Sequence, residues 1–207
     1  MDNKIVSAVI WDLGGVLIDW NPEYLYSRIF RSRYAIKYFL DNICTSDWNE
    51  EQDGGRSFQE GTELLISRFP EYTPEIQAFY GRWREMLGGE IRTSVEILDK
   101  MKRNGNMPLY ALTNWSAESF PIALELYEFL HWFDGILVSG AEGIKKPDPA
   151  IYELILDRYQ LDRSAVLFID DNIRNINAAR ASGIESVHYT DAESLKQSLI
   201  EYGVILP

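Results

Sequence analysis

Carboxylates follow two of the most apolar stretches of this 207-residue chain. Asp12 comes directly after the apolar run at residues 5–11, and the pair Asp170 and Asp171 begins directly after the run at residues 165–169. Carboxylate oxygens bind hard cations such as Mg²⁺, and a carboxylate can also act as a nucleophile. Each of these residues also fits a simpler role as a turn or helix-capping residue after a buried strand.

Three further polar residues occupy similar places. Thr113 and Asn114 follow the apolar run at residues 109–112, and Lys146 directly precedes Pro147. A threonine hydroxyl and backbone N–H groups at a helix start can hold phosphate oxygens. A lysine ammonium can neutralise a phosphate or a crowded nucleophile. Alone, each residue also fits a cap or a solvated loop, so their common placement is what indicates chemistry.

A parallel sheet is the element that would bring these residues together. From residue 92 onward, helical segments alternate with short apolar runs. Strands are expected at residues 109–112, 135–138, 165–169 and 186–189, in addition to the first run. This alternation predicts an α/β fold, a Rossmann-like doubly wound parallel sheet with helices on both faces. In such sheets ligands bind at the carboxyl ends of the strands, where Asp12, Thr113 and Asp170 would meet.

The segment between the first strand and this alternating region has a helical pattern throughout. Apolar residues recur at helical spacing, and glycine and proline breakers separate the segments. Helices are expected at residues 22–30, 33–42, 57–68 and 74–87. The pattern predicts a helical cap domain of residues 19–88 inserted after the first strand, with residues 1–18 and 89–207 forming the core domain.

The composition narrows the class of protein. A formal net charge of −12 argues against a nucleic-acid partner, because phosphate backbones attract basic surfaces. The single cysteine, Cys44, fits a reducing compartment. No apolar run is long enough to cross a membrane, and the first run does not resemble a secretory signal. We therefore expect a cytoplasmic protein, a monomer or small homo-oligomer, that contacts neither membrane nor nucleic acid.

The order of the motifs along the chain resembles that of the haloacid dehalogenase superfamily. The four motifs of that superfamily are similar to residues 10–17 (Ile-Trp-Asp-Leu-Gly-Gly-Val-Leu), 112–114 (Leu-Thr-Asn), 143–149 (Gly-Ile-Lys-Lys-Pro-Asp-Pro) and 168–172 (Phe-Ile-Asp-Asp-Asn). The resemblance covers the whole core and implies a Rossmann-like core under a helical cap. Most members are Mg²⁺-dependent phosphatases that work through an aspartyl-phosphate.

The resemblance implies a role for each matching residue. Asp12 would be the nucleophile and a metal ligand, together with the main-chain carbonyl of Gly14 and the carboxylates of Asp170 and Asp171. Thr113 and Asn114 would hold the transferring phosphoryl group, and Lys146 would neutralise charge between the nucleophile and the phosphate. The expected cofactor is Mg²⁺, and the expected partner is a small phosphorylated metabolite.

One position departs from the pattern. In most phosphatases of the superfamily, the second residue after the nucleophile is an aspartate that protonates the leaving group, but here it is Gly14. Losing a general acid–base typically costs about 10²- to 10⁴-fold in rate. The resemblance to Asp-x-Gly sugar-phosphate phosphatases favours an enzyme that uses another group or takes substrates with good leaving groups. Asp19 is a candidate substitute, although it also fits a structural role between core and cap.

Two alternatives stay open. The 2-haloacid dehalogenases also lack the second aspartate, but they need no metal and usually lack the pair found here at Asp170 and Asp171. A weakly active or non-catalytic relative that only binds its ligand is the other alternative. The retained pair favours the metal-dependent phosphatase.

Substrate choice is expected to come from cap residues that face the core. The candidates are Trp20, Asn21, Trp48, Asn49, Asp53 and Arg56. An arginine such as Arg56 could clamp an anionic or polyol ligand, and a tryptophan such as Trp48 could stack on a sugar face. The same segment also fits a helix–loop–helix corner with a surface arginine and a core tryptophan.

Overall fold

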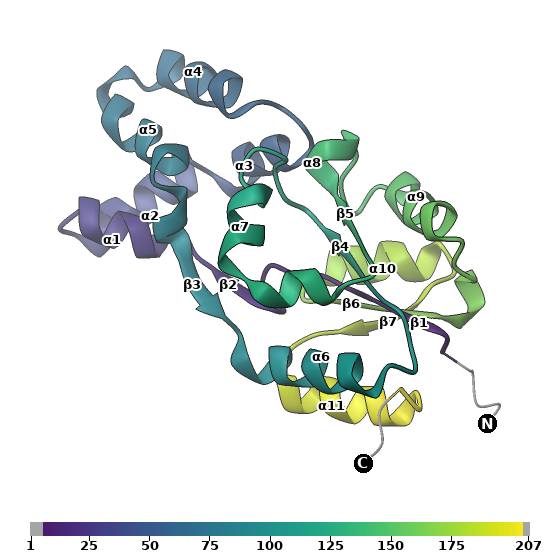
Figure 1. Ribbon diagram of the computed structural model, residues 1–207. Helices are drawn as coiled ribbons and strands as arrows, with labels where there is room; N and C mark the ends of the chain where they lie inside the picture. The colour runs from purple at the N-terminus through teal and green to yellow at the C-terminus, as the bar shows by residue number, and fades with distance from the viewer. Residues whose placement is uncertain (1–5, 205–207) are drawn as a thin grey trace.

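A five-stranded parallel sheet organises the larger lobe of this computed structural model, which describes residues 6–204 (Figure 1). The strands are β1 (Ala8–Trp11), β4 (Leu109–Thr113), β5 (Gly135–Val138), β6 (Val166–Asp170) and β7 (Glu185–His188). Their order in the sheet is β5-β4-β1-β6-β7. The chain adds β4 and β5 on one side of β1 and then β6 and β7 on the other. The predicted doubly wound α/β fold is confirmed, while residue 5, where the first run begins, lies outside the described residues.

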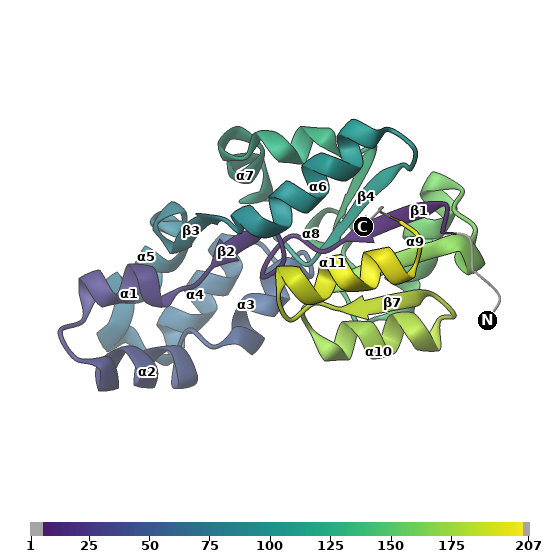
Figure 2. The ribbon, with the colours of Figure 1, turned by 90° about the horizontal axis from the view of Figure 1, so that it is seen from below.

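Helices cover both faces of this sheet, as Figures 1 and 2 show. They are α6 (Arg92–Asn104), α7 (Phe120–Leu126), α9 (Pro149–Tyr159), α10 (Ile173–Ala181) and α11 (Ala192–Glu201), while the short α8 (Ser139–Glu142) directly follows β5. Val9 and Trp11 of β1 pack in one apolar cluster with residues of α6, α7 and α11. Ala8 and Ile10 pack in a second cluster with residues of α9 and α10. Because both faces are buried, β1 is a continuous apolar run.

A second, helical lobe lies between β1 and β4 in the sequence. Its helices are α1 (Glu23–Ile29), α2 (Arg33–Asn42), α3 (Ser46–Asp53), α4 (Phe58–Arg68) and α5 (Thr73–Gly81). Aromatic rings fill its interior, where the Tyr26 and Phe39 ring centroids lie 4.7 Å apart. The helices predicted at residues 22–30, 33–42 and 57–68 are confirmed to within one residue at each end. The assignment of residues 19–88 to a separate cap domain stays a prediction.

Helix α3 was not predicted, because its sequence is almost entirely polar and shows no apolar period. Two features of the chain nevertheless stabilise it. The Thr45 side chain caps its start by accepting a hydrogen bond from the backbone N–H of Trp48. The Trp48 indole packs inward and donates a hydrogen bond to the Gly61 carbonyl of α4 at 3.0 Å. A single buried aromatic residue therefore anchors the helix.

The helix predicted over residues 74–87 is too long. It ends at Gly81, and the chain continues as a 3₁₀ turn (Trp83–Met86) and then as strand β3 (Leu87–Glu90). This strand pairs antiparallel with β2 (Ile18–Trp20) and forms a ribbon that joins the two lobes (Figure 1). Pairing with a distant segment outweighs the local helical spacing. Among residues 6–204, no helix is long and apolar enough to cross a membrane.

Candidate active site

Three carboxylates meet at the carboxyl edge of the sheet. Asp12 follows β1, Asp170 is the last residue of β6, and Asp171 comes next. One oxygen from each carboxylate lies within 4.8 Å of the others. Asp12 is held in place by a hydrogen bond from its backbone N–H to the Ile169 carbonyl at 2.8 Å. Two adjacent parallel strands therefore place the cluster directly.

Lys146 extends its side chain beneath these carboxylates, and none of it is exposed. Its Nζ lies 2.9 Å from Asp12 Oδ1 and 2.7 Å from Asp170 Oδ2, and it donates to the Leu112 carbonyl at 2.8 Å. These contacts use all three ammonium donors. Asn175 Nδ2 lies 3.1 Å from both oxygens of Asp170, and this second partner fixes that carboxylate.

The electrostatics of the cluster favour a bound cation. Burial raises the pKa of Asp12 well above its usual range; Lys146 opposes this shift, and Asp170 and Asp171 add to it. Burial also raises the pKa of Asp171, with a further contribution from Asp170. For Lys146, burial acts to lower the pKa, but Asp12 and Asp170 outweigh it and raise the value, so the ammonium stays charged. One ammonium facing three carboxylates leaves an excess of negative charge.

This donor set fits Mg²⁺. Carboxylate oxygens are the ligands that this ion prefers, and it usually keeps waters or substrate oxygens in its remaining positions. Asp12, Asp170 and Asp171 supply the carboxylates, and a divalent ion would relieve the repulsion among them.

The two glycines after Asp12 differ sharply in their surroundings. Gly15 has φ +74°, and a Cβ at this position would lie 2.2 Å from Asp171 Oδ2. Only glycine combines this backbone conformation with such a close approach. Gly14 lines the pocket, and a Cβ there would meet nothing within 4 Å. The space that a side chain at residue 14 would occupy is therefore open.

Two residues at the end of β4 have different environments. Thr113 Oγ1 is buried and forms no hydrogen bond with any described residue. Asn114 pairs with the backbone of Lys146: Nδ2 donates to its carbonyl and Oδ1 accepts from its N–H, both at 2.8 Å. Asn114 thus fixes the segment that carries Lys146, while it also lines the pocket.

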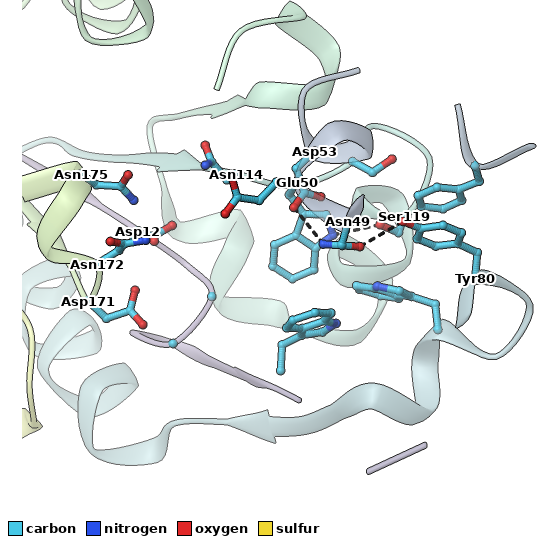
Figure 3. A pocket seen from close by; sticks show the side chains of 17 residues that line it. Asp12, Asn49, Glu50, Asp53, Tyr80, Asn114, Ser119, Asp171, Asn172 and Asn175 are labelled. Atoms are coloured by element: carbon cyan, nitrogen blue, oxygen red, sulfur yellow. Dashed lines mark hydrogen bonds between the residues drawn. The ribbon is translucent and has the colours of Figure 1, made fainter. Parts of the chain in front are cut away.

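A pocket of about 310 Å³ opens above this edge (Figure 3). We call the lining residues of the sheet lobe the sheet-edge wall and those between residues 18 and 90 the helical wall. The sheet-edge wall contains Asp12, Gly14, Gly15, Asn114, Trp115, Ser116, Ser119, Asp171, Asn172 and Asn175. The helical wall contains Trp20, Asn49, Glu50, Asp53, Phe58, Tyr80 and Trp83. The pocket therefore has carboxylates at the sheet edge and a helical wall that is rich in aromatic rings.

Not every residue that sequence analysis singled out in the helical segment lines this pocket. Trp20, Asn49 and Asp53 do. Trp48 and Arg56 do not: Arg56 donates from Nε to Gln52 Oε1 at 2.5 Å and from Nη2 to the Trp48 carbonyl at 3.0 Å. These two residues hold the helical lobe together. Trp48 is buried, as the helix–loop–helix interpretation expects, whereas Arg56 is half-buried and not a surface arginine.

Asn21 and Asp19 also lie away from the pocket. Asn21 Oδ1 accepts from the backbone N–H of Glu23 at the start of α1. Asp19 Oδ2 accepts from the Tyr24 hydroxyl at 2.7 Å, beside Gly88 in the ribbon between the lobes. The carboxylate considered as a substitute acid therefore has a structural environment.

Most of the aromatic lining was not predicted from the sequence, namely Phe58, Tyr80, Trp83 and Trp115, and neither was Glu50. Trp115 follows Thr113 and Asn114 directly, so its place after a strand end was a usable signal. The others come from the helical lobe, and no local pattern reveals which of its side chains face the sheet.

Comparisons with known proteins agree with this architecture. The family described as haloacid dehalogenase-like hydrolases matches residues 6–183. A sesquiterpene phosphatase of Aspergillus oryzae is 30% identical over 185 residues, which are 89% of this chain and 90% of that protein. A phosphorylated carbohydrates phosphatase of Thermotoga maritima is 27% identical over 97% of this chain and 93% of its own length.

Solved structures show the same fold. An HAD-family enzyme of Bacteroides thetaiotaomicron, solved as a magnesium complex, aligns with a TM-score of 0.70 at 17% identity. The alignment covers 89% of this chain and 93% of that one. Fold, site and family match together define a hydrolase with a doubly wound core. The chain belongs to the haloacid dehalogenase-like hydrolase family.

Proposed function

We propose that the protein is a Mg²⁺-dependent phosphatase that hydrolyses a small phosphorylated metabolite through an aspartyl-phosphate on Asp12. The observation that carries this proposal is the grouping of Asp12 with Asp170, Asp171 and Lys146 at the base of a pocket. Phosphoryl transfer requires mainly positioning and neutralisation of charge. This group of side chains offers both.

The contacts of Asp12 suggest how it would attack. Oδ1 accepts from the Leu13 N–H at 2.8 Å and lies 2.9 Å from Lys146 Nζ. Among residues 6–204, no hydrogen bond is formed to Oδ2, so this oxygen is the one we assign to attack on phosphorus. Mg²⁺ held by Asp12, Asp170, Asp171 and the Gly14 carbonyl would supply charge neutralisation for the phosphoryl oxygens. Thr113 Oγ1 would donate to a phosphoryl oxygen.

The carbon skeleton of the substrate would pack on the aromatic part of the pocket. Phe58 and Tyr80 stack with their ring centroids 3.7 Å apart, and the ring centroids of Trp83 and Trp115 lie 5.5 Å apart. Such rings suit a sugar face or another apolar surface. The two related phosphatases, named for a sesquiterpene and for phosphorylated carbohydrates, support this range of substrates. A pocket of about 310 Å³ is in the range for a small molecule.

The test is phosphate release from a panel of sugar phosphates, acyl phosphates, prenyl phosphates and an aryl phosphate. We expect release that requires both Mg²⁺ and Asp12, with Asp12→Asn reducing turnover to background. Release that persists in Asp12→Asn, or no release by the wild type with Mg²⁺ present, contradicts the proposal.

A second candidate function is hydrolysis of a 2-haloacid, and one observation favours it. Gly14 carries no acid, and a halide leaves without needing a proton. Against it, dehalogenation would give no use to the clustered carboxylates of Asp170 and Asp171. Metal-independent halide release from 2-chloropropionate by the wild type, absent in Asp12→Asn, would establish this second function.

We also propose a cytoplasmic location and a small-molecule partner only. The acidic composition and the single cysteine support both. Gel filtration with light scattering would measure whether the protein is a monomer or a small homo-oligomer.

A further inference from the structure

The proposed phosphatase needs a proton donor for its leaving group, and Gly14 cannot supply one. In phosphoryl transfer the attacking and leaving oxygens lie roughly in line on opposite sides of phosphorus. With Asp12 attacking from the sheet-edge wall, the leaving oxygen points away from it, toward the helical wall. The donor is therefore to be sought on that wall.

We propose that Asp53, near the end of α3, is the general acid and base of this site. The inference rests on the proposed phosphatase function and deepens it by naming the group that replaces the missing aspartate. Asp53 lines the same pocket as Asp12, and Figure 3 shows it on the other side of that pocket from Asp12 and Asp171.

Contacts with the sheet lobe fix the end of α3 beside the pocket. The Ser139 hydroxyl donates to the backbone carbonyl of Asp53 at 2.5 Å. Lys145 Nζ donates to the carbonyl of Glu50, one turn earlier, at 3.0 Å. Gly55, just beyond the helix, has φ +107°, and a Cβ there would lie 3.4 Å from the Gly140 carbonyl oxygen. The backbone around Asp53 is therefore held against the core at several points.

A directional chain of hydrogen bonds orients the Asp53 carboxylate. Gln52 Nε2 donates to the Tyr80 hydroxyl at 2.6 Å, and that hydroxyl donates to Asn49 Oδ1 at 3.0 Å. Asn49 Nδ2 then donates to Asp53 Oδ2 at 3.1 Å (Figure 3). One oxygen of the Asp53 carboxylate is thus fixed by a neutral donor, as a group that exchanges protons requires.

The charges around Asp53 suit proton exchange near neutral pH. Burial raises the pKa of Asp53 to about 7, Lys145 acts to lower it and Glu50 to raise it. The third titratable group facing it is the Tyr80 hydroxyl, whose own pKa is raised, mainly by burial. Both protonation states of Asp53 are therefore present at pH 7, as an acid that later acts as a base needs.

Other carboxylates fit this role less well. Glu50 also lines the helical wall, but its carboxylate is paired with Lys145 at 3.4 Å. Asp53 forms no ion pair with any residue in the described part of the chain. Asp19 lies outside the pocket and accepts from Tyr24.

The proposed reaction has two steps, and Asp53 exchanges one proton in each. Asp12 Oδ2 bonds to phosphorus as the bond from phosphorus to the leaving oxygen breaks, and protonated Asp53 gives its proton to that oxygen, which leaves as an alcohol. A water molecule then bonds to phosphorus and gives a proton to the Asp53 carboxylate. The bond between phosphorus and Asp12 breaks and releases inorganic phosphate, with Asp53 protonated again.

The test compares kcat/KM for an alkyl phosphate and an aryl phosphate in Asp53→Asn, because kcat/KM reports the steps up to release of the leaving group. We expect kcat/KM to fall about 10²- to 10⁴-fold for the alkyl phosphate. It should change little for the aryl phosphate, whose leaving group departs without a proton. Asp47→Asn, at an exposed position of the same helix, is the matched control.

Two further measurements keep the test decisive. Because a side chain at Gly14 meets open space, Gly14→Asp combined with Asp53→Asn should restore kcat/KM for the alkyl phosphate. In the wild type, the ratio of kcat/KM for the alkyl phosphate to kcat/KM for the aryl phosphate should fall above pH 7. Because this measurement uses the wild type alone, it does not require any variant to fold.

The outcomes distinguish a failure of the role of Asp53 from a failure of the phosphatase proposal. An equal loss for both substrates in Asp53→Asn, or a pH-independent ratio in the wild type, overturns the role of Asp53 while leaving the phosphatase proposal standing. Wild-type turnover that does not depend on Asp12 overturns both.

Discussion

The two walls of the pocket are built in different ways. On the sheet-edge wall, Asp12 is fixed by its place at a strand end, and a fully buried lysine contacts it. On the helical wall, Asp53 is fixed by hydrogen bonds between side chains and by contacts between the lobes. The position of the charge-neutralising groups therefore depends on the topology of the sheet. The position of the group proposed to protonate the leaving oxygen depends on how the two lobes pack.

This difference separates the expected consequences of substitution. Removing a group from the sheet edge leaves a buried charge without its partner, which costs several kcal/mol. Removing a group from the helical wall breaks neutral hydrogen bonds, which contribute about 1 kcal/mol each. Substitutions on the sheet-edge wall should therefore lower the free energy of unfolding strongly, and substitutions on the helical wall should lower it weakly.

The largest effect is expected for Lys146→Met, which leaves Asp12 and Asp170 buried without their ammonium partner. We expect a loss of about 3–5 kcal/mol in the free energy of unfolding at pH 7, together with loss of turnover. Urea unfolding measures the first and phosphate release the second.

The pH dependence of this variant has a definite sign. The pKa of Asp12 is already raised in the folded protein, and loss of Lys146 raises it further. The folded state then binds more protons than the unfolded state, so stability falls as pH rises from the unfolded pKa toward the folded one. Urea midpoints of Lys146→Met should thus approach those of the wild type on acidification. A pH-independent difference contradicts this account.

A smaller effect is expected for Gly15→Ala. The positive φ costs about 1–2 kcal/mol for a residue with a side chain, and the new Cβ would displace the Asp171 carboxylate. We expect lower stability and a higher Mg²⁺ concentration for half-maximal phosphate release. Gly14→Ala is the matched control for stability, because its Cβ meets nothing within 4 Å. Equal unfolding midpoints for the two variants would contradict the geometry.

The smallest effect is expected for Arg56→Ala on the helical side. Arg56 bonds to Gln52 and to the Trp48 carbonyl, both within the helical lobe. Because each of these two bonds contributes about 1 kcal/mol at most, we expect a loss of about 1–2 kcal/mol in stability and an unchanged KM for every phosphorylated substrate. A KM that rises tenfold or more at unchanged kcat would instead show that Arg56 binds substrate.

The same division explains what sequence could predict. Asp12, Asp170 and Lys146 belong to short segments whose order fixes where the strand ends meet, so their convergence was predictable. Helix α3 was not, because Trp48 is its only large apolar residue and its capping Thr45 has no apolar pattern after it. Strand β3 was missed because only its pairing with β2 makes residues 87–90 extended. The surroundings of Asp53 depend on its contact with Ser139, which is far from it in sequence.

One measurement tests this division of labour most directly. The Asp53→Asn variant is mixed with Mg²⁺ and an aryl phosphate, and the reaction is quenched in acid. The protein is then digested, and the mass of the peptide that contains Asp12 is measured by mass spectrometry. The sheet-edge wall should form the aspartyl-phosphate, and the altered helical wall should fail to hydrolyse it. We therefore predict that the phosphoryl group accumulates on Asp12 beyond its level in the wild type. A phosphoryl group on another residue, or none on Asp12 in either protein, would contradict the account.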